Sequence, residues 1–171
     1  LSGIDDRARI NLARAETAVA AIAQGQKFAI NHARERIATS WIALGDLGQA
    51  GEAALRITDA GIRTGVWWQI AVAHIDAGAT QLAQKSTNNA IASIASVKST
   101  LDRVRLYCGR VQIMAERRNN QQALLAFSKA MEIARGIRHS WTRAQALVRL
   151  VEAFSALPGP LAGSKSNSLK N

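Results

Sequence analysis

Proline is almost absent from this sequence of 171 residues, since the only two prolines stand at positions 158 and 160. A proline inside a helix removes a backbone donor and clashes with the preceding turn, so its absence from residues 1–157 favours uninterrupted helices. Hydrophobic residues make up 48% of the chain, which is enough to bury a continuous core. We therefore expect an all-α protein of about seven to eight helices, and we reject the all-β alternatives.

Cysteine and long apolar runs are also scarce. The single cysteine, Cys108, excludes an intrachain disulfide framework and a cysteine-rich zinc site. No run approaches the roughly 18 apolar residues of a membrane span, and the first residues lack the charged-then-apolar order of a signal peptide. We expect a soluble protein without a membrane span. The compartment stays open, with the cytoplasm favoured.

Residue patterns that carry chemistry are missing as well. The three histidines, His32, His74 and His139, form no HExxH motif and have no ligand partner four residues away on a helix. The glycines occur singly, never as a phosphate-binding loop. No base neighbours Cys108 in the sequence to activate it as a nucleophile. We expect no catalytic residues, no metal site and no cofactor, and hence a protein that is not an enzyme.

Charge, by contrast, is strongly one-sided. Lysine and arginine number 22 against 12 acidic residues, which gives a net charge of +10. Sixteen of the basic residues are arginine and six are lysine. This balance implies attraction to anionic partners, which include nucleic acid, acidic proteins and lipid headgroups. Aromatic residues, which stack on bases, make up only 5% of the chain.

The main positive feature is a pattern of small and bulky residues that recurs after 33 residues. The recurring pairs are Ala38 and Ala71, Trp41 and His74, Gly45 and Gly78, and Ala50 and Ala83. A unit of this length is typical of two helices that bury their apolar faces only by stacking on neighbouring units. The pattern therefore predicts a helical repeat.

Apolar spacing and turn residues divide the chain into helices. The expected ranges are 5 or 6 to 24, 27–44, 49–62, 66–77, 79–97, 101–117, 120–136 and 140–157. Gly61 and Gly65 are expected to flank a break, and Lys85–Asn89 to allow a kink. One stripe of the first helix is expected to hold Ile10, Ala13, Thr17, Ala20 and Ala21. We expect one domain over residues 1–157 and a flexible tail over residues 158–171.

The repeated residues resemble the tetratricopeptide repeat (TPR) family. Its unit of about 34 residues places a small residue, an aromatic, a turn glycine and an alanine in the order of Ala38, Trp41, Gly45 and Ala50. A third unit is similar through Ala123, Phe127 and Ala130. If Gly109 takes its first small position, the interval to Ala123 is fourteen residues instead of twelve. No unit ends with the family's closing proline. The resemblance implies an α-solenoid of antiparallel helix pairs, a right-handed superhelix whose first helices line a concave, partner-binding groove.

Mapping that groove onto this chain selects six candidate binding residues. They are His32, Thr39, Trp68, Arg103, Arg110 and Arg143. Consecutive helical residues point about 100° apart, so we place Trp67 in the core and Trp68 toward the groove. The alternative is that both indoles are partly buried at a boundary between units.

Planar guanidinium groups suit carboxylates, so such a groove would take an acidic or C-terminal segment with an apolar anchor. The other reading is that the arginines form only a solvated face.

Three functions follow from these features. The first is a non-enzymatic protein–protein interaction module, a scaffold or adaptor that binds a partner segment in its concave groove. The second is a basic repeat protein that binds nucleic acid. The third is a subunit of a larger helical assembly, because Val148, Val151 and Phe154 on the last helix need a cover. The third function includes self-association.

Overall fold

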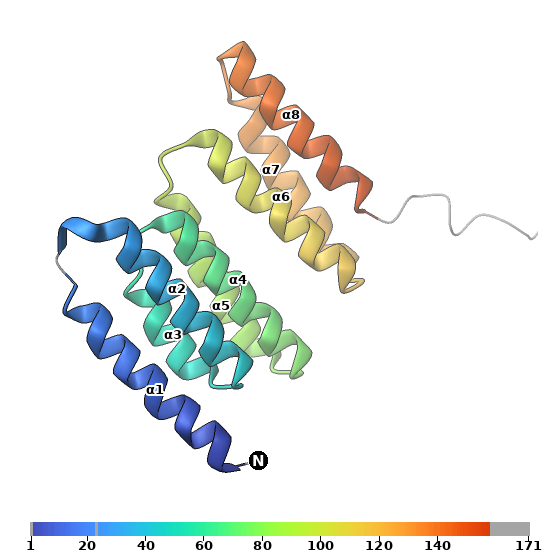
Figure 1. The fold of residues 1–171 in the computed structure, drawn as a ribbon. Coiled ribbons are helices and arrows are strands. Elements are labelled where there is room, and N and C mark those ends of the chain that lie inside the picture. The colour runs from blue at the N-terminus through green and yellow to red at the C-terminus, as the bar shows by residue number, and fades with distance from the viewer. Residues whose placement is uncertain (1, 23, 158–171) are drawn as a thin grey trace, which may run out of the picture. The chain divides into compact units, whose positions relative to one another are not determined.

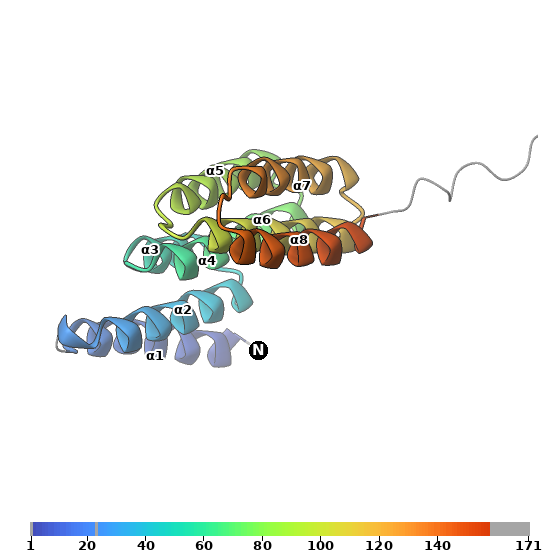
Figure 2. The same cartoon turned by 90° about the horizontal axis from the view of Figure 1, so that it is seen from above.

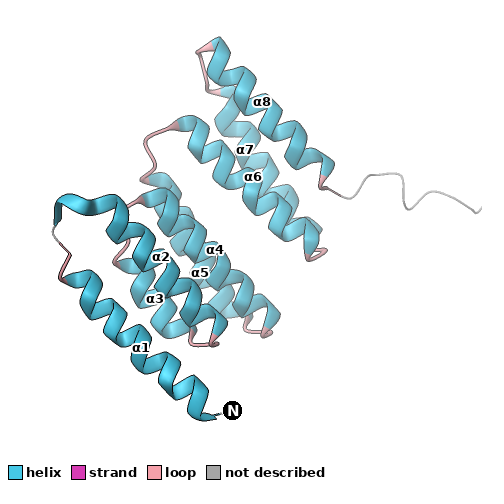
Figure 3. Ribbon diagram, viewed as in Figure 1, coloured by secondary structure: helices cyan, strands magenta, loops and turns pink. Residues whose placement is uncertain are grey.

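The computed structural model describes residues 2–22 and 24–157, and this part of the chain is entirely helical, with no strand (Figure 3). It contains eight α-helices and one short 3₁₀ helix, η1. Their bounds are α1 Ser2–Ala20, η1 Gln24–Gln26, α2 Lys27–Ala43, α3 Leu47–Leu55, α4 Ala60–Asp76, α5 Thr80–Ala95, α6 Thr100–Glu116, α7 Asn120–Arg135 and α8 Ser140–Ser155. The predicted all-α class is confirmed. The predicted tail, residues 158–171, lies outside the described residues.

Contacts between helices divide the chain into two compact units, Leu1–Val97 and Lys98–Asn171. In the first unit α2 packs against α1, α3 and α4, while α4 also packs against α3 and α5 (Figures 1 and 2). In the second unit α6, α7 and α8 all contact one another. The single domain expected over residues 1–157 stays a prediction, and each unit is described by itself.

The turn after α2 and the turn after α4 have the same geometry. Gly45 and Gly78 have φ angles of 73° and 72°, a left-handed conformation in which a Cβ atom would be strained. The amide that follows each glycine donates to a carbonyl five residues earlier, Asp46 to Trp41 at 3.0 Å and Ala79 to His74 at 2.8 Å. The predicted equivalence of these two turns is confirmed.

The turn after α6 repeats this geometry with a different residue. Arg118 has a φ of 55°, and the Asn119 amide donates to the Met114 carbonyl at 2.9 Å. Arg118 is therefore the counterpart of Gly45 and Gly78. Counting back from this turn aligns Val111, not Gly109, with Ala38 and Ala71. The expected longer interval in the third unit is wrong, because Val111 precedes Ala123 by the usual twelve residues.

These aligned positions have the same environment. Ala38, Ala71 and Val111 are all fully buried, and so are Ala50 and Ala123, while Ala83 is nearly so. Close packing between neighbouring helices explains why two of the three mid-helix positions carry only a methyl group.

The full repeat is 40 residues long, and the interval of 33 is its shortened form. Helices α4, α6 and α8 begin at Ala60, Thr100 and Ser140, and α5 and α7 begin at Thr80 and Asn120. Helix α3 has 9 residues where α5 and α7 have 16. The missing seven residues amount to about two helical turns, so the chain leaves the shorter helix from nearly the same face.

Several expected boundaries are wrong for identifiable reasons. The break lies at residues 56–59 rather than at Gly61 and Gly65, because the Asp59 carboxylate accepts from the Ile62 amide at 2.8 Å and starts α4 there. Helix α5 runs through Lys85–Asn89 without a kink.

The expected stripe of the first helix is also misplaced in the structure. Its five members, from Ile10 to Ala21, are all exposed, whereas Val19, on another side of α1, is buried. Helix α1 packs against α2, and its stripe of small residues faces solvent.

Candidate functional site

Two of the predicted groove residues lie on α2. His32 is half-exposed, and its Nδ1 lies 2.9 Å from a carboxylate oxygen of Glu35. Its ring meets Phe28 edge-on, with a distance of 4.3 Å between ring centroids. Thr39 is exposed, and its Oγ1 lies 3.4 Å from Oε1 of Gln69 on α4. His32 and Thr39 thus offer polar atoms along α2, but no cavity joins them in the described residues.

Trp68 does not face an open groove. It is 4% exposed and Trp67 is 7% exposed, so both indoles are buried. The expectation that Trp68 would be accessible to a partner is corrected. The physical reason is that α4 is covered by α2, α3 and α5, and six of its residues are buried.

Arg110 is also buried, and its Nη2 donates to Oε1 of Gln122 on α7 at 3.2 Å. Burial lowers the pKa of this guanidinium to about 10. The 40-residue register explains its position, since Ile70 and Leu150 occupy the same place and are also buried. Arg110 therefore belongs to a core position, which corrects its assignment to an exposed groove.

Arg143 binds backbone carbonyls of the preceding loop. Its Nε donates to Ile137 O at 2.9 Å, and Nη2 donates to Arg138 O at 3.4 Å. Arg63 makes the same contact 80 residues earlier, with Nη1 donating to Ile57 O at 2.7 Å. Arg103 stands halfway between them and is half-buried. The arginine contacts at positions 63 and 143 join the start of a helix to the end of the preceding one.

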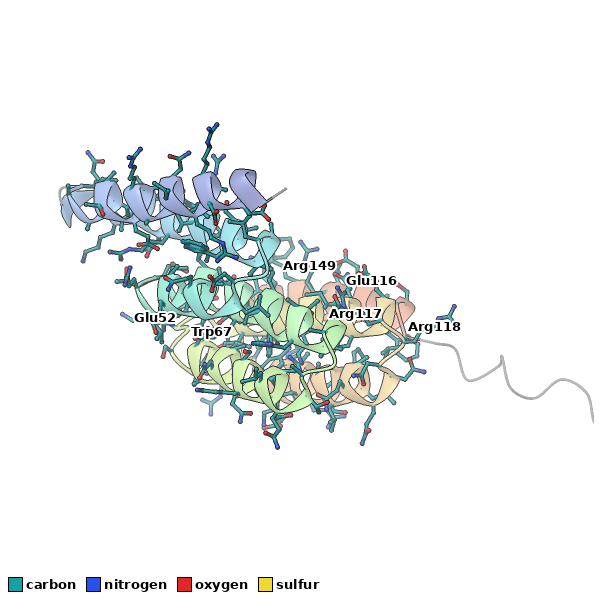
Figure 4. All side chains as sticks on the ribbon, turned by 90° about the horizontal axis from the view of Figure 1, so that it is seen from below. Glu52, Trp67, Glu116, Arg117, Arg118 and Arg149 are labelled. Carbon is teal, nitrogen blue, oxygen red and sulfur yellow. The ribbon has the colours of Figure 1, made fainter. Side chains whose placement is uncertain are left out.

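The first unit contains a cleft between α3 and α5 with α4 as its floor. Its volume is about 350 Å³. Trp67 lies in the floor and Glu52 on the α3 side (Figure 4). Leu55, Trp67 and Asn89 also line a neighbouring pocket of about 200 Å³, so the two hollows are continuous. The six predicted residues do not line this cleft.

The rim of the cleft is apolar and exposed. Leu55 on α3 is 63% exposed and Leu82 on α5 is 50% exposed. Glu52 and Lys85 add one charge of each sign, and His74 closes the floor, its pKa lowered by burial. A site with an aromatic floor, leucine walls and a mixed polar edge suits an apolar side chain with backbone or charged groups around it.

Helix length and one glycine shape this cleft. A Cβ atom on Gly51 would lie 3.3 Å from Trp67 Cη2, so glycine lets α3 approach the indole closely. Asn89, Ala92 and Ser93 line the smaller pocket from α5, and they belong to the last two turns of α5, which have no counterpart in α3.

Sequence reasoning missed these residues, although a signal existed. Leu55 and Leu82 lie beside, not within, the buried small-residue stripes of their helices.

Reactive groups do not gather at this cleft or elsewhere in the described residues. No group of three or more histidine, cysteine or acidic side chains there is arranged to hold a metal ion. Burial raises the pKa of the Cys108 thiol to about 11, with a smaller contribution from the negative charge of Glu152. The thiol is therefore protonated near neutral pH. Within the same residues, no helix has both the length and the apolar character to cross a membrane.

Comparisons with known proteins return no relative. No protein-family model, no curated protein and no solved structure matches this chain.

Proposed function

We propose that this protein is a non-enzymatic interaction module of the helical-repeat type, with its helices arranged as antiparallel pairs in a solenoid. It binds a segment of a partner protein in the cleft between α3 and α5. The observation that carries this proposal is the buried Trp67 indole between two exposed leucines, Leu55 and Leu82. Large exposed apolar residues beside a preformed hollow mark a binding surface.

The shape and charge of the cleft support a peptide segment as the ligand. A volume of about 350 Å³ accommodates a few side chains. The edge carries Glu52 and Lys85, one charge of each sign, rather than a set of converging cations that would select an anion. The partner segment is therefore one that presents large apolar side chains on one face, as amphipathic helices do.

A groove lined by first helices has less support than the cleft. Such a groove was expected to use Trp68, Arg110 and Arg143 for an acidic or C-terminal segment. The first two side chains are buried, and the third bonds to backbone carbonyls. His32 and Thr39 are the accessible remainder on α2, and they supply little apolar surface.

The test uses a double variant of the rim, Leu55→Asp with Leu82→Asp. Both side chains are exposed, so the fold is expected to survive, which circular dichroism checks. Selection from a displayed library of random peptides of about 12 residues is expected to enrich sequences with large apolar residues. Fluorescence polarisation with a selected peptide then measures affinity, and the double variant is expected to lose at least about tenfold.

Leu124→Asp is the matched control. Leu124 is a leucine on α7 that is 54% exposed and lies outside the cleft. It is expected to bind the selected peptide like the parent. Failure to enrich any peptide, or equal affinity in the double variant, would reject the cleft as the binding site.

Nucleic-acid binding is the second candidate, favoured by charge. Arg117 and Arg118 are exposed at the turn after α6, and Arg149 lies on α8 of the same unit (Figure 4). They contribute to the net charge of +10. The buried Trp67, Trp68 and Tyr107 rings, however, are closed to stacking on bases. We rank this function below protein interaction.

A further inference from the structure

Helix α8 presents an apolar face to solvent. Leu147, Val148, Val151 and Phe154 lie at spacings of one, three and three residues, and all four are exposed. Val148 is 58% exposed and Val151 is 69% exposed. Four large apolar side chains along one helix form a surface that a folded protein usually covers. We call these four residues the α8 face.

The same face is buried in the other helices of the repeat. Trp68 and Ala71 of α4 stand 80 residues before Val148 and Val151, and both are buried. Cys108 and Val111, at the midpoint of this interval on α6, are buried too. The difference lies in the neighbours, because α4 packs against α5 and α6 packs against α7. Within the described residues α8 packs only against the two helices that precede it.

The helices that cover α4 and α6 share one character. They turn a stripe of small residues inward, which lets the two backbones approach closely. In α5 the buried stripe contains Ala83, Ser86 and Ala90, and in α7 the buried alanines are Ala123, Ala126, Ala130 and Ala134. A helix that suits the α8 face is therefore one with small residues at spacings of three and four.

Helix α1 carries such a stripe, and it faces solvent. Ile10, Ala13, Thr17 and Ala20 follow one another at spacings of three, four and three residues, and all are exposed. Val19, which is buried, lies on the side of α1 that packs against α2. Among the described helices α1 contacts α2 only, as a helix that follows no other in the chain. We call these four residues the α1 stripe.

We propose that the α1 stripe of one copy of this protein docks on the α8 face of a second copy. The contact reproduces the packing of α5 on α4 and of α7 on α6, with one partner from each chain. It is a head-to-tail contact between two different surfaces, so each copy keeps one free surface for the next copy. Residues 158–171, which follow α8, do not supply such a stripe in sequence, since they contain two prolines and one alanine.

The test blocks each surface separately. Val151→Glu places a charge on the α8 face, and Ala13→Glu places one on the α1 stripe, both at exposed positions where folding tolerates the change. Sedimentation velocity of the parent at up to about 0.5 mM is expected to show mass growing with concentration. Each single variant is expected to stay monomeric under these conditions. Leu125→Glu, an exposed leucine of α7 outside both surfaces, is the control and is expected to assemble like the parent.

Mixing the two variants distinguishes a head-to-tail contact from a symmetric one. The Val151→Glu chain keeps its α1 stripe, and the Ala13→Glu chain keeps its α8 face, so an equimolar mixture is expected to form dimers and nothing larger. A parent that stays monomeric at the highest concentration would overturn the proposal. So would Val151→Glu chains that assemble like the parent, or Ala13→Glu chains that dimerise by themselves through two α8 faces.

Discussion

Single residues decide the conformation of the turns in this protein. Gly45 and Gly78 hold positive φ angles, and Arg118 holds one at the third turn despite its Cβ atom. A left-handed residue other than glycine is destabilised by roughly 1–2 kcal/mol per position. The asparagine after Arg118 compensates in part, because its side chain accepts from the Gln122 amide at 3.3 Å and caps α7.

Replacing Gly45 by alanine tests this account. Open space surrounds the site of the new methyl group, so only the strain of a positive φ acts on the folded state. We expect Gly45→Ala to lower the free energy of unfolding by about 1 kcal/mol. Urea denaturation followed by circular dichroism measures the change.

Gly109→Ala is the matched control for this change. Gly109 lies inside α6, where a Cβ atom also meets open space and alanine is the better helix former. We expect Gly109→Ala to raise the free energy of unfolding by up to about 1 kcal/mol. An equal effect of the two substitutions would show that turn strain is not the cause.

At the scale of helices, the interval of 33 residues was predictable from the sequence, and the repeat of 40 was not. Alanine and glycine mark the first two turns, and the structure confirms that Ala38 matches Ala71 and Gly45 matches Gly78. The third turn carries neither marker, because valine replaces alanine at position 111 and arginine replaces glycine at position 118. Gly109 was therefore chosen in error, two residues from the true position.

Helix lengths were harder to predict, because apolar spacing reads the same in a short helix and in a long one. Helix α3 ends at Leu55 since Asp59 starts the next helix, and both Gly61 and Gly65 are tolerated inside α4. The roles of Arg110 and Arg143 depend on neighbours distant in the sequence, so composition alone overstated their access to a partner.

Inserting residues at the end of α3 tests the register of the repeat. Copying Asn89–Ala95 after Leu55 adds seven residues, which is nearly two whole turns, so the chain still leaves on the same face. We expect this insertion to keep the stability within about 1 kcal/mol. An insertion of five residues rotates the exit by roughly 140° and is expected to lower the free energy of unfolding by about 2 kcal/mol or more. Equal stability of both variants in urea would contradict the account of the shortened helix.

For the whole molecule, net charge sets the behaviour toward anions. A charge of +10 attracts any polyanion at low salt, whether or not a specific site exists. We expect a duplex of about 20 base pairs to bind at low salt and to lose at least tenfold in affinity between roughly 50 and 200 mM salt, as non-specific contacts do. Fluorescence anisotropy measures both values. Micromolar affinity that persists at the higher salt would place nucleic-acid binding above the cleft as the main function.

The position of α4 also governs how the first unit opens. Helix α4 touches α2, α3 and α5, whereas α1 touches only α2 among the described helices. A helix enclosed on three sides loses its backbone hydrogen bonds only when its neighbours separate, so its amides exchange with solvent through the largest opening event. Helix α1 detaches on its own. The middle of the first unit is therefore its most protected part, and the stripe that α1 shows to solvent is held by its most loosely attached helix.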